Sequence, residues 1–225
     1  MPLLMCDLDN TLIDREAVFG RWAWDLVTEF GGDEGDVRWL VEIDGDGYTP
    51  REVVANAVRS HFHLADEVPA LVDRFRDEIA SRCTPGEGVL DGLAAARAAG
   101  WALVIVTNGA PIQEVKIRAA GLDAAVDGWC VSSIEGTTKP DRLIFERAAA
   151  VVGHRLDPRD WMVGDSAEHD IVGGHEVGVS TAWMRRRRTW ALDSIRPTIE
   201  VDSFAEGVTE ILAMSDGDDR SGLYD

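Results

Sequence analysis

The sequence predicts an α/β fold, in which a parallel sheet covered by helices on both faces is interrupted by a block of helices. Two observations support this prediction. From residue 89 onward, short apolar runs typical of buried strands alternate with helical patterns, which favours a parallel sheet. Between the apolar runs at 2–6 and 101–106, residues 15–82 show helical patterns and no convincing strand. We therefore expect an α/β core with a helical insert.

Local signals predict the elements of the N-terminal part. The run Pro2-Leu3-Leu4-Met5-Cys6 is a short buried strand. An amphipathic helix follows over 14–30, with Asp14 as a plausible N-cap, and Gly31-Gly32 ends it. The other helices of the insert are expected over 33–43, 51–63 and 66–82. This part is predicted to be all-helical after the first strand.

Strands and helices alternate in the second part. The continuous apolar character of 101–106 indicates a strand that helices cover on both faces. The other expected strands are 126–131, 161–163, 180–184 and 198–201, and the expected helices are 89–99, 111–120, 141–152, 169–176 and 204–214. The polar tail 215–225 is expected to be disordered. The predicted core comprises 1–14 and 84–214, and the predicted insert comprises 15–83.

Composition limits the partners and the location. The 225 residues carry a net charge of −19, with 41 acidic and 22 basic side chains, so nucleic acids and anionic membranes are not expected partners. No transmembrane run or signal peptide is evident, which predicts a soluble, cytoplasmic protein. We also expect a monomer or homodimer. The three cysteines, Cys6, Cys83 and Cys130, lack metal-ligand spacing and indicate reduced thiols.

Two aspartates follow the first predicted strand. On an extended chain, Asp7 and Asp9 point the same way, so both carboxylates face one small volume. The repulsion between two carboxylates at so short a distance is unfavourable unless a divalent cation and a lysine neutralise their charges. Our hypothesis is that Asp7 attacks the substrate, that Asp9 shuttles a proton, and that a metal holds both. The rest of the sequence should supply the lysine, the other metal ligands and the phosphate donors.

Three later segments supply these groups at further strand ends. Thr107-Asn108-Gly109 offers a hydroxyl, an amide and backbone N–H groups as phosphate donors. Lys139-Pro140-Asp141 offers a point positive charge. Gly164-Asp165-Ser166, followed by Asp170, offers hard oxygen ligands suited to Mg²⁺. Since ligands of such sheets bind at the carboxyl ends of the strands, we expect these groups to meet.

The four motifs together resemble one family. Asp-x-Asp-x-Thr, Thr-Asn-Gly, Lys-Pro-Asp and Gly-Asp-Ser-x₃-Asp, in this order, are similar to the motifs of the haloacid dehalogenase superfamily of hydrolases. The resemblance covers essentially residues 3–214. It implies a Rossmann-like core, and the helical insert looks like the family's type-one α-helical cap. Such a cap would hang over the site as a lid, leave the chemistry to the core and select the substrate.

The resemblance also implies a role for each motif residue. Asp7 would be the nucleophile and form an aspartyl-phosphate intermediate. Asp9 would protonate the leaving oxygen and then deprotonate the attacking water, and its backbone carbonyl would ligate the metal. Asp7 would be a metal ligand as well. The implied cofactor is Mg²⁺.

The remaining motif residues would bind the substrate and the metal. Thr107 and Asn108 would bind the transferring phosphoryl group. Lys139 would neutralise the nucleophile and the phosphate. Asp165 would ligate Mg²⁺, and Asp170 would either ligate it through water or orient Lys139. Read without the resemblance, Asp170 could equally be the N-cap of the helix that follows.

Counting charges gives a further expectation. The charges of the four aspartates Asp7, Asp9, Asp165 and Asp170 sum to −4, and Lys139 together with Mg²⁺ adds three positive charges. One negative charge remains unless Asp9 holds a proton, and a neutral carboxyl group is what a general acid requires. Without the metal, the site should exclude phosphate, so this count predicts absolute Mg²⁺ dependence.

Asp9 also favours one reaction class. By family analogy, dehalogenases lack a proton-shuttling aspartate here, because halide leaves without a proton. We therefore expect a Mg²⁺-dependent phosphatase of a small phosphorylated metabolite, such as phosphoglycolate, a sugar phosphate or a nucleoside monophosphate. The alternatives are a haloacid dehalogenase, a phosphomutase, which keeps this aspartate, or a non-catalytic binding protein on the same fold.

Two sets of basic residues lie outside the motifs. By their chemistry and their rough position in the insert, Arg15, Arg21, Arg51 and Tyr48 are candidates for selecting the substrate. The run 185–188 consists of four arginines. On so acidic a chain, we expect it to be a solvated loop that pairs with surface carboxylates, with an oligomer contact or an anion site as the alternatives.

Overall fold

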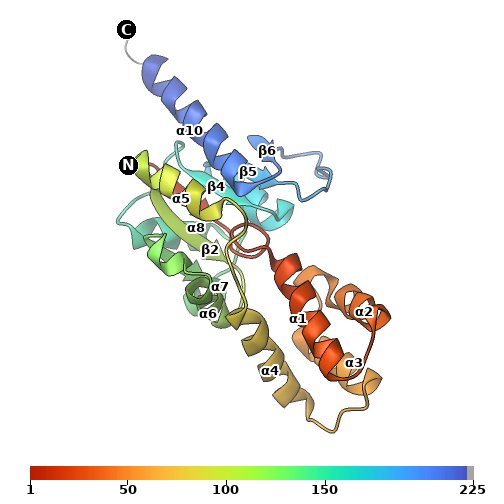
Figure 1. The fold of residues 1–225 in the computed structure, drawn as a ribbon. Coiled ribbons are helices and arrows are strands. Elements are labelled where there is room, and N and C mark those ends of the chain that lie inside the picture. Colours follow the sequence, from red (N-terminus) through yellow and green to blue (C-terminus); the bar gives the residue numbers. More distant parts are fainter. Residues whose placement is uncertain (222–225) are drawn as a thin grey trace. The chain divides into compact units, whose positions relative to one another are not determined.

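The structure is a computed structural model and describes residues 1–221 (Figure 1). It divides into two compact units. The core unit consists of Met1–Ile13 and the chain from Pro85 onward, and the insert unit is Asp14–Thr84. Among the described helices, none combines the length and the apolar character that crossing a membrane requires. The three cysteines are buried and form no disulfide.

The described part of the core unit contains a sheet of six parallel strands in the order β3-β2-β1-β4-β5-β6. The strands are β1 (Leu3–Cys6), β2 (Ala102–Thr107), β3 (Gly128–Val131), β4 (Trp161–Gly164), β5 (Ser180–Met184) and β6 (Ile199–Val201). The strand order reverses between β1 and β4, which is the switch point where such sheets bind ligands. The predicted α/β fold class is confirmed.

Helices cover both faces of this sheet (Figure 1). Alternate strand residues, including Met5 and Val104, pack with Phe145 of α8 (Arg142–Val151) in the main core cluster. On the opposite face lie α5 (Val89–Ala98) and α10 (Phe204–Ser221). The other helices of this unit are α6 (Ile112–Ala119), η2 (Leu122–Ala124), α7 (Ser132–Glu135), η3 (Ala167–Ile171) and α9 (Val172–Val177). The short elements α7 and η2 were not predicted from the sequence, and the helix predicted over 169–176 corresponds to the end of η3 together with α9.

The insert unit is helical throughout its regular elements. It contains α1 (Arg15–Glu29), α2 (Glu34–Asp44), η1 (Gly45–Gly47), α3 (Arg51–His61) and α4 (Val68–Ser81). Asp14 caps α1 by accepting a hydrogen bond from the backbone of Ala17 (3.0 Å), as its position predicted. Trp22 is fully buried between the rings of Phe19 and Phe75, at centroid distances of 5.1 and 5.0 Å.

The C-terminal prediction differs from the structure. We expected disorder from residue 215, but α10 runs over Phe204–Ser221. Residues 222–225 of the predicted tail lie outside the described residues. The polar composition was misleading because extending an existing helix fixes one residue per added hydrogen bond, whereas starting a helix is costly.

Candidate active site

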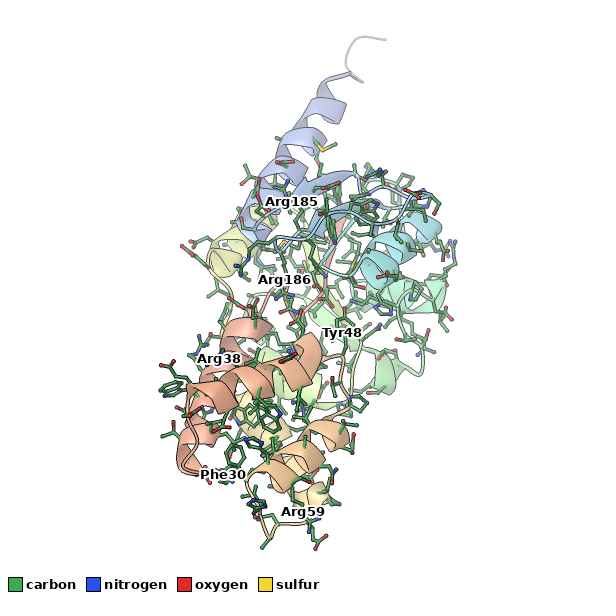
Figure 2. The ribbon with its side chains drawn as sticks, turned by 90° about the vertical axis from the view of Figure 1, so that its right-hand side faces the viewer. Phe30, Arg38, Tyr48, Arg59, Arg185 and Arg186 are labelled. Carbon is green, nitrogen blue, oxygen red and sulfur yellow. The ribbon has the colours of Figure 1, made fainter. Side chains whose placement is uncertain are left out.

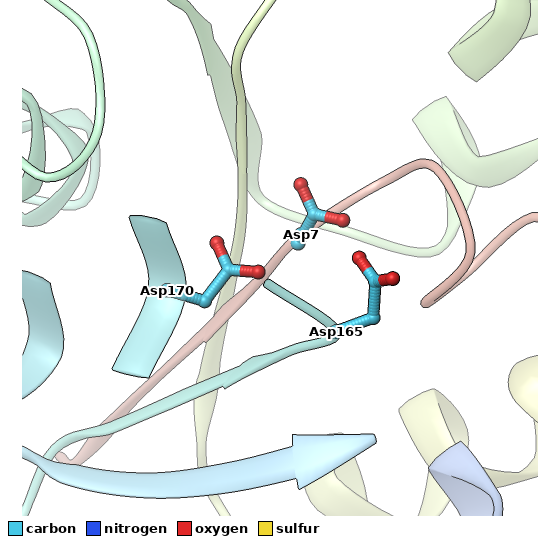
Figure 3. A group of neighbouring side chains, drawn as sticks. All are labelled: Asp7, Asp165 and Asp170. Atoms are coloured by element: carbon cyan, nitrogen blue, oxygen red, sulfur yellow. The ribbon is translucent and has the colours of Figure 1, made fainter. Parts of the chain in front are cut away.

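Asp7 lies directly after β1, at the switch point. Its backbone N–H donates to the carbonyl of Val163 (2.9 Å), so the pairing with β4 continues past the strand and fixes the start of the side chain. Asp165 directly follows β4, and Asp170 lies in the π-helix η3 just beyond. All three residues are buried, and one carboxyl oxygen of each lies within 4.8 Å of the others (Figure 3). The fold thus brings three of the predicted site residues together.

This group of carboxyl oxygens fits a divalent cation. Mg²⁺ binds hard oxygen ligands, usually one or two carboxylates together with water and substrate oxygens. Burial, together with the nearby Asp170, raises the pKa of Asp165 above its usual range, although Arg188 and Arg186 oppose this. A bound cation would favour the ionised carboxylates. The side chain of Asp9 is not part of the group.

Lys139 sits among the carboxylates and is 2% exposed. Its Nζ lies 2.7 Å from Oδ1 of Asp7 and 2.7 Å from Oδ1 of Asp170. Burial alone would lower the pKa of Lys139, but the charges of Asp170 and Asp7 outweigh it, so the pKa lies above its usual range. Burial raises the pKa of Asp7 to about 7 against the opposing charge of Lys139, and Asp170 and Asp165 add to the rise.

The second motif positions Lys139. The side-chain amide of Asn108 donates to the carbonyl of Lys139 (3.0 Å), and its oxygen accepts from the N–H of Lys139 (2.9 Å). Asn108 therefore ties the end of β2 to the segment that carries the lysine. The hydroxyl of Thr107 is buried and accepts a hydrogen bond from Gln113 (2.8 Å). Sequence reasoning had assigned both residues to phosphate binding only.

Gly164 makes room for Asp170. A Cβ atom on Gly164 would lie 2.1 Å from Oδ2 and 2.3 Å from Cγ of Asp170. The same Oδ2 accepts a hydrogen bond from the backbone N–H of Ser166 (3.0 Å), and Asp170 is 1% exposed. The carboxyl group is thus held on one side by the turn and on the other by Lys139. In the Gly-Asp-Ser motif, the glycine is needed because any side chain would occupy the place of this carboxylate.

We expect Gly164→Ala to lower the free energy of unfolding by about 2 kcal/mol, because the added methyl group must displace a buried carboxylate. Mg²⁺ binding, measured by calorimetry, should weaken as well. Gly20→Ala is the matched control, since its Cβ meets no atom within 4 Å and it lies within α1, where alanine is favoured over glycine. Urea unfolding checks both variants. Equal stability of Gly164→Ala and the native chain would show that Asp170 moves aside freely.

Asp9 has partners that the sequence analysis missed. Lys116 of α6 lies 2.6 Å from Oδ2 and 2.9 Å from Oδ1 of Asp9. The side-chain amide of Gln113, also on α6, donates to Oδ2 (2.9 Å). Asp7 and Asp9 thus contact different cations, although we expected both carboxylates to share one volume. That expectation assumed an extended chain through both aspartates, but β1 ends at Cys6, before Asp7.

Part of the arginine run also reaches the site. Arg188 Nη2 lies 2.9 Å from Oδ2 of Asp165, and Arg186 Nη1 lies 3.5 Å from the same oxygen. Arg185 instead pairs with the exposed Asp202 (2.6 Å). Figure 2 shows Arg185 and Arg186 on the segment that follows β5. The expectation of surface pairing therefore holds for Arg185 and is wrong for Arg186 and Arg188, because this segment folds back onto the end of β4.

These contacts change the charge count. Lys116, Arg186 and Arg188 add three positive charges that the motifs alone did not include. With Lys139, the four cations balance the four aspartates before any metal is present. A bound Mg²⁺ would then give the site two positive charges, which match a phosphate dianion. By this count, a phosphate dianion can enter the metal-bound site without a proton on Asp9.

The insert unit contains a separate charged cluster. Asp44 is 1% exposed and binds both Arg15 (2.8 Å) and Arg51 (3.0 Å). Both guanidinium groups lie over the ring of Phe19. A cavity of about 240 Å³ is lined by Arg15, Glu16, Phe19, Val41, Asp44 and Asp46. Tyr48 is 71% exposed (Figure 2), and Arg21 is also exposed. Two of the four candidate substrate-selecting residues are thus held by Asp44.

The buried lysine and its carboxylates lie at the switch point of the parallel sheet, where such folds bind their ligands. The chain belongs to the haloacid dehalogenase-like hydrolases, because the model of this family matches residues 1–178. The predicted family membership is confirmed.

Three known proteins illustrate the similarity. The chain is 36% identical over 138 residues to YjjG, a pyrimidine 5′-nucleotidase of Escherichia coli K12, and the match spans 60% of each protein. It is 33% identical over 214 residues to a glyceraldehyde 3-phosphate phosphatase of Pyrococcus abyssi, covering 82% of each. The fold resembles that of YfnB, a magnesium-bound hydrolase of Bacillus subtilis, with a TM-score of 0.68, 22% identity, and coverage of 93% of this chain and 98% of YfnB.

Proposed function

We propose that this hydrolase is a Mg²⁺-dependent phosphatase, which cleaves the phosphate monoester of a small metabolite through an aspartyl-phosphate on Asp7. The observation that carries the proposal is the ammonium of Lys139, which lies 2.7 Å from Asp7 inside a buried group of carboxylates. With Lys139 and a bound metal beside it, Asp7 would be ionised and a suitable nucleophile. Asp7, Asp165 and Asp170, with the backbone carbonyl of Asp9, would hold the metal.

In the first step, Asp7 attacks the phosphorus and the bond to the leaving oxygen breaks. The leaving oxygen takes both bonding electrons and receives a proton from Asp9. Lys139 would offset the charge of the nucleophile and of the phosphoryl oxygens, and Thr107 and Asn108 are the proposed hydrogen-bond donors to those oxygens. When bound, Mg²⁺ supplies further positive charge to the phosphoryl group.

In the second step, water attacks the phosphorus of the aspartyl-phosphate and gives its proton to Asp9. The bond between Asp7 and phosphorus breaks, and inorganic phosphate leaves. Asp9 regains its proton and Asp7 its carboxylate, so the enzyme returns to its starting state. One side chain thus serves as acid and then as base, as in other two-step hydrolyses.

The substrate class is a small phosphorylated metabolite. The relatives support this, because YjjG is a pyrimidine 5′-nucleotidase and the Pyrococcus abyssi relative acts on glyceraldehyde 3-phosphate. We propose that the insert 15–83 acts as the cap that selects among such esters, with Arg21 and Tyr48 the exposed candidates. The acidic composition supports a small molecule rather than a nucleic acid as substrate. The protein is proposed to act in the cytoplasm.

Asp9 supports phosphate ester hydrolysis over the alternative of carbon–halogen cleavage. An alkoxide leaving group needs a proton, whereas a halide does not. Because Asp9 is held by both Lys116 and Gln113, this side chain is positioned rather than incidental. Halide release from 2-haloacids should therefore be absent.

The test is a screen of pyrimidine and purine 5′-monophosphates, triose phosphates, sugar phosphates and phosphoglycolate, with phosphate release as the readout. We expect turnover of at least one ester with Mg²⁺, none in excess chelator, and recovery when Mg²⁺ is restored, because the cation held by the three clustered carboxylates would supply the net positive charge that a phosphate dianion requires. Turnover in chelator would contradict the metal requirement. Inactivity toward every ester, or halide release from 2-haloacids, would contradict the proposed reaction.

A further inference from the structure

One face of α6 delivers two side chains to Asp9. Gln113 and Lys116 are three residues apart, a spacing that places side chains next to each other on a helix. Lys116 contacts both carboxyl oxygens of Asp9, at 2.9 and 2.6 Å, and Gln113 contacts Oδ2 at 2.9 Å. The side chain of Lys116 is 13% exposed and that of Asp9 is 25% exposed. With donors on both oxygens, rotation of the carboxyl group is restricted.

Gln113 also links Asp9 to the phosphate-binding motif. Its Nε2 donates to Thr107 Oγ1 (2.8 Å) as well as to Asp9, which uses both N–H bonds of the amide. Gln113 is 3% exposed and bends back over Gly109, where a Cβ atom would lie 2.8 Å from its Cγ. The distance between Asp9 and Thr107 is thus set by one buried amide group.

The use of lysine in this chain is selective. Of the 22 basic residues in the sequence, 20 are arginine and only Lys116 and Lys139 are lysine. Lys139 contacts Asp7, and Lys116 contacts Asp9. A compact ammonium fits beside a carboxylate without the planar, forked geometry that arginine imposes. Each of the two aspartates of the first motif thus has its own lysine, although nothing in the four motifs marks Lys116.

We propose that Lys116 and Gln113 are positioning residues, which hold the carboxyl group of Asp9 in the orientation for proton transfer to the leaving-group oxygen. This inference rests on the proposed phosphatase function. Both residues contact the carboxyl group of Asp9, and neither is proposed to contact the substrate. Because the two residues act through Asp9, the loss of activity in their variants should be larger for leaving groups that depend more strongly on a proton.

The test compares two esters in Lys116→Met and the native chain. An alkyl phosphate, such as glycerol phosphate or a nucleoside monophosphate, needs its leaving oxygen protonated, whereas the phenolate of p-nitrophenyl phosphate leaves with little help. The measured quantity is kcat/KM, which reports the steps up to the first cleavage. We expect kcat/KM to fall by about 100-fold for the alkyl ester and by much less for the aryl ester. A loss of about 100-fold is at the lower end of the rate contribution that general acid catalysis typically makes.

Three companion variants control for folding and charge. Lys116→Arg keeps the positive charge and should recover part of the loss on the alkyl ester. Gln113→Leu should show the same preference for the aryl ester, with a smaller effect. Arg118→Met, on the same helix but paired with Glu114, should behave like the native chain with both esters. Thermal unfolding of each variant identifies any that fail to fold.

Equal losses on both esters, or no loss on either, would overturn the positioning role while leaving the phosphatase assignment intact. If the native chain with Mg²⁺ hydrolyses neither these esters nor any other phosphate monoester, the proposed function fails and the inference fails with it. A selective loss on the alkyl ester, with part of it recovered in Lys116→Arg, supports both.

Discussion

Asp7→Asn is expected to lower kcat for phosphate monoester hydrolysis by at least about 10³-fold, because an amide cannot form the aspartyl-phosphate. Lys139, Asp165 and Asp170 would remain, so substrate binding should survive better than turnover. The measurement is phosphate release with saturating Mg²⁺ and the best substrate found in the screen. A residual rate within tenfold of the native rate would rule out Asp7 as the nucleophile.

The same variant should keep its fold. Burial raises the pKa of Asp7 to about 7, so in the metal-free protein the folded state favours the protonated form. The resulting stabilisation is present below the unfolded pKa near ~4 and is lost as the pH rises through about 7. Asp7→Asn lacks this loss, and its melting temperature near pH 8 should be no lower than that of the native metal-free chain. Asp123→Asn is the control for the replacement of aspartate by asparagine, because Asp123 is exposed.

Lys139→Met is expected to lower kcat/KM by about 10²- to 10³-fold, because it removes the positive charge that faces both the nucleophile and the phosphoryl oxygens. Breaking a buried ion pair leaves an uncompensated charge and typically costs about 3–5 kcal/mol of folding free energy. The metal-free variant should therefore be clearly less stable than the native chain. Steady-state kinetics and urea unfolding measure the two effects.

Metal binding separates this explanation from simple misfolding. Without the ammonium, Asp7 and Asp170 lose their shared partner, so Mg²⁺ should raise the melting temperature of Lys139→Met more than that of the native chain. Arg142→Met, which removes an exposed cation paired with Glu146, should change neither activity nor stability appreciably. If Lys139→Met kept more than a tenth of the native kcat/KM, the lysine would have no electrostatic role in the reaction.

The sequence predicted the part of the site that the sheet dictates. Asp7 and Asp165 follow strands that pair with each other, and the carboxyl ends of parallel strands meet at one edge. Their convergence therefore follows from strand order alone. Lys139 and Asp170 lie in segments beyond their strands, yet their motif spacing was sufficient to place them among the candidates.

The rest of the site depends on features that spacing does not encode. Gln113 and Lys116 reach Asp9 because of the rotation of α6 about its axis, which is set by packing. Arg188 reaches Asp165 because the chain after β5 folds back. Composition held one usable signal, since only two lysines occur in a chain with 20 arginines.

The central claim is that Asp7 carries the phosphoryl group during turnover. The most direct test is to mix the enzyme with Mg²⁺ and substrate, quench within the first turnover, reduce any acyl phosphate with borohydride and analyse the peptides that carry the four aspartates by mass spectrometry. We predict that residue 7 is converted to homoserine, and that Asp9, Asp165 and Asp170 are not. Homoserine at another position, or rapid turnover without any reduced aspartate, would contradict the account.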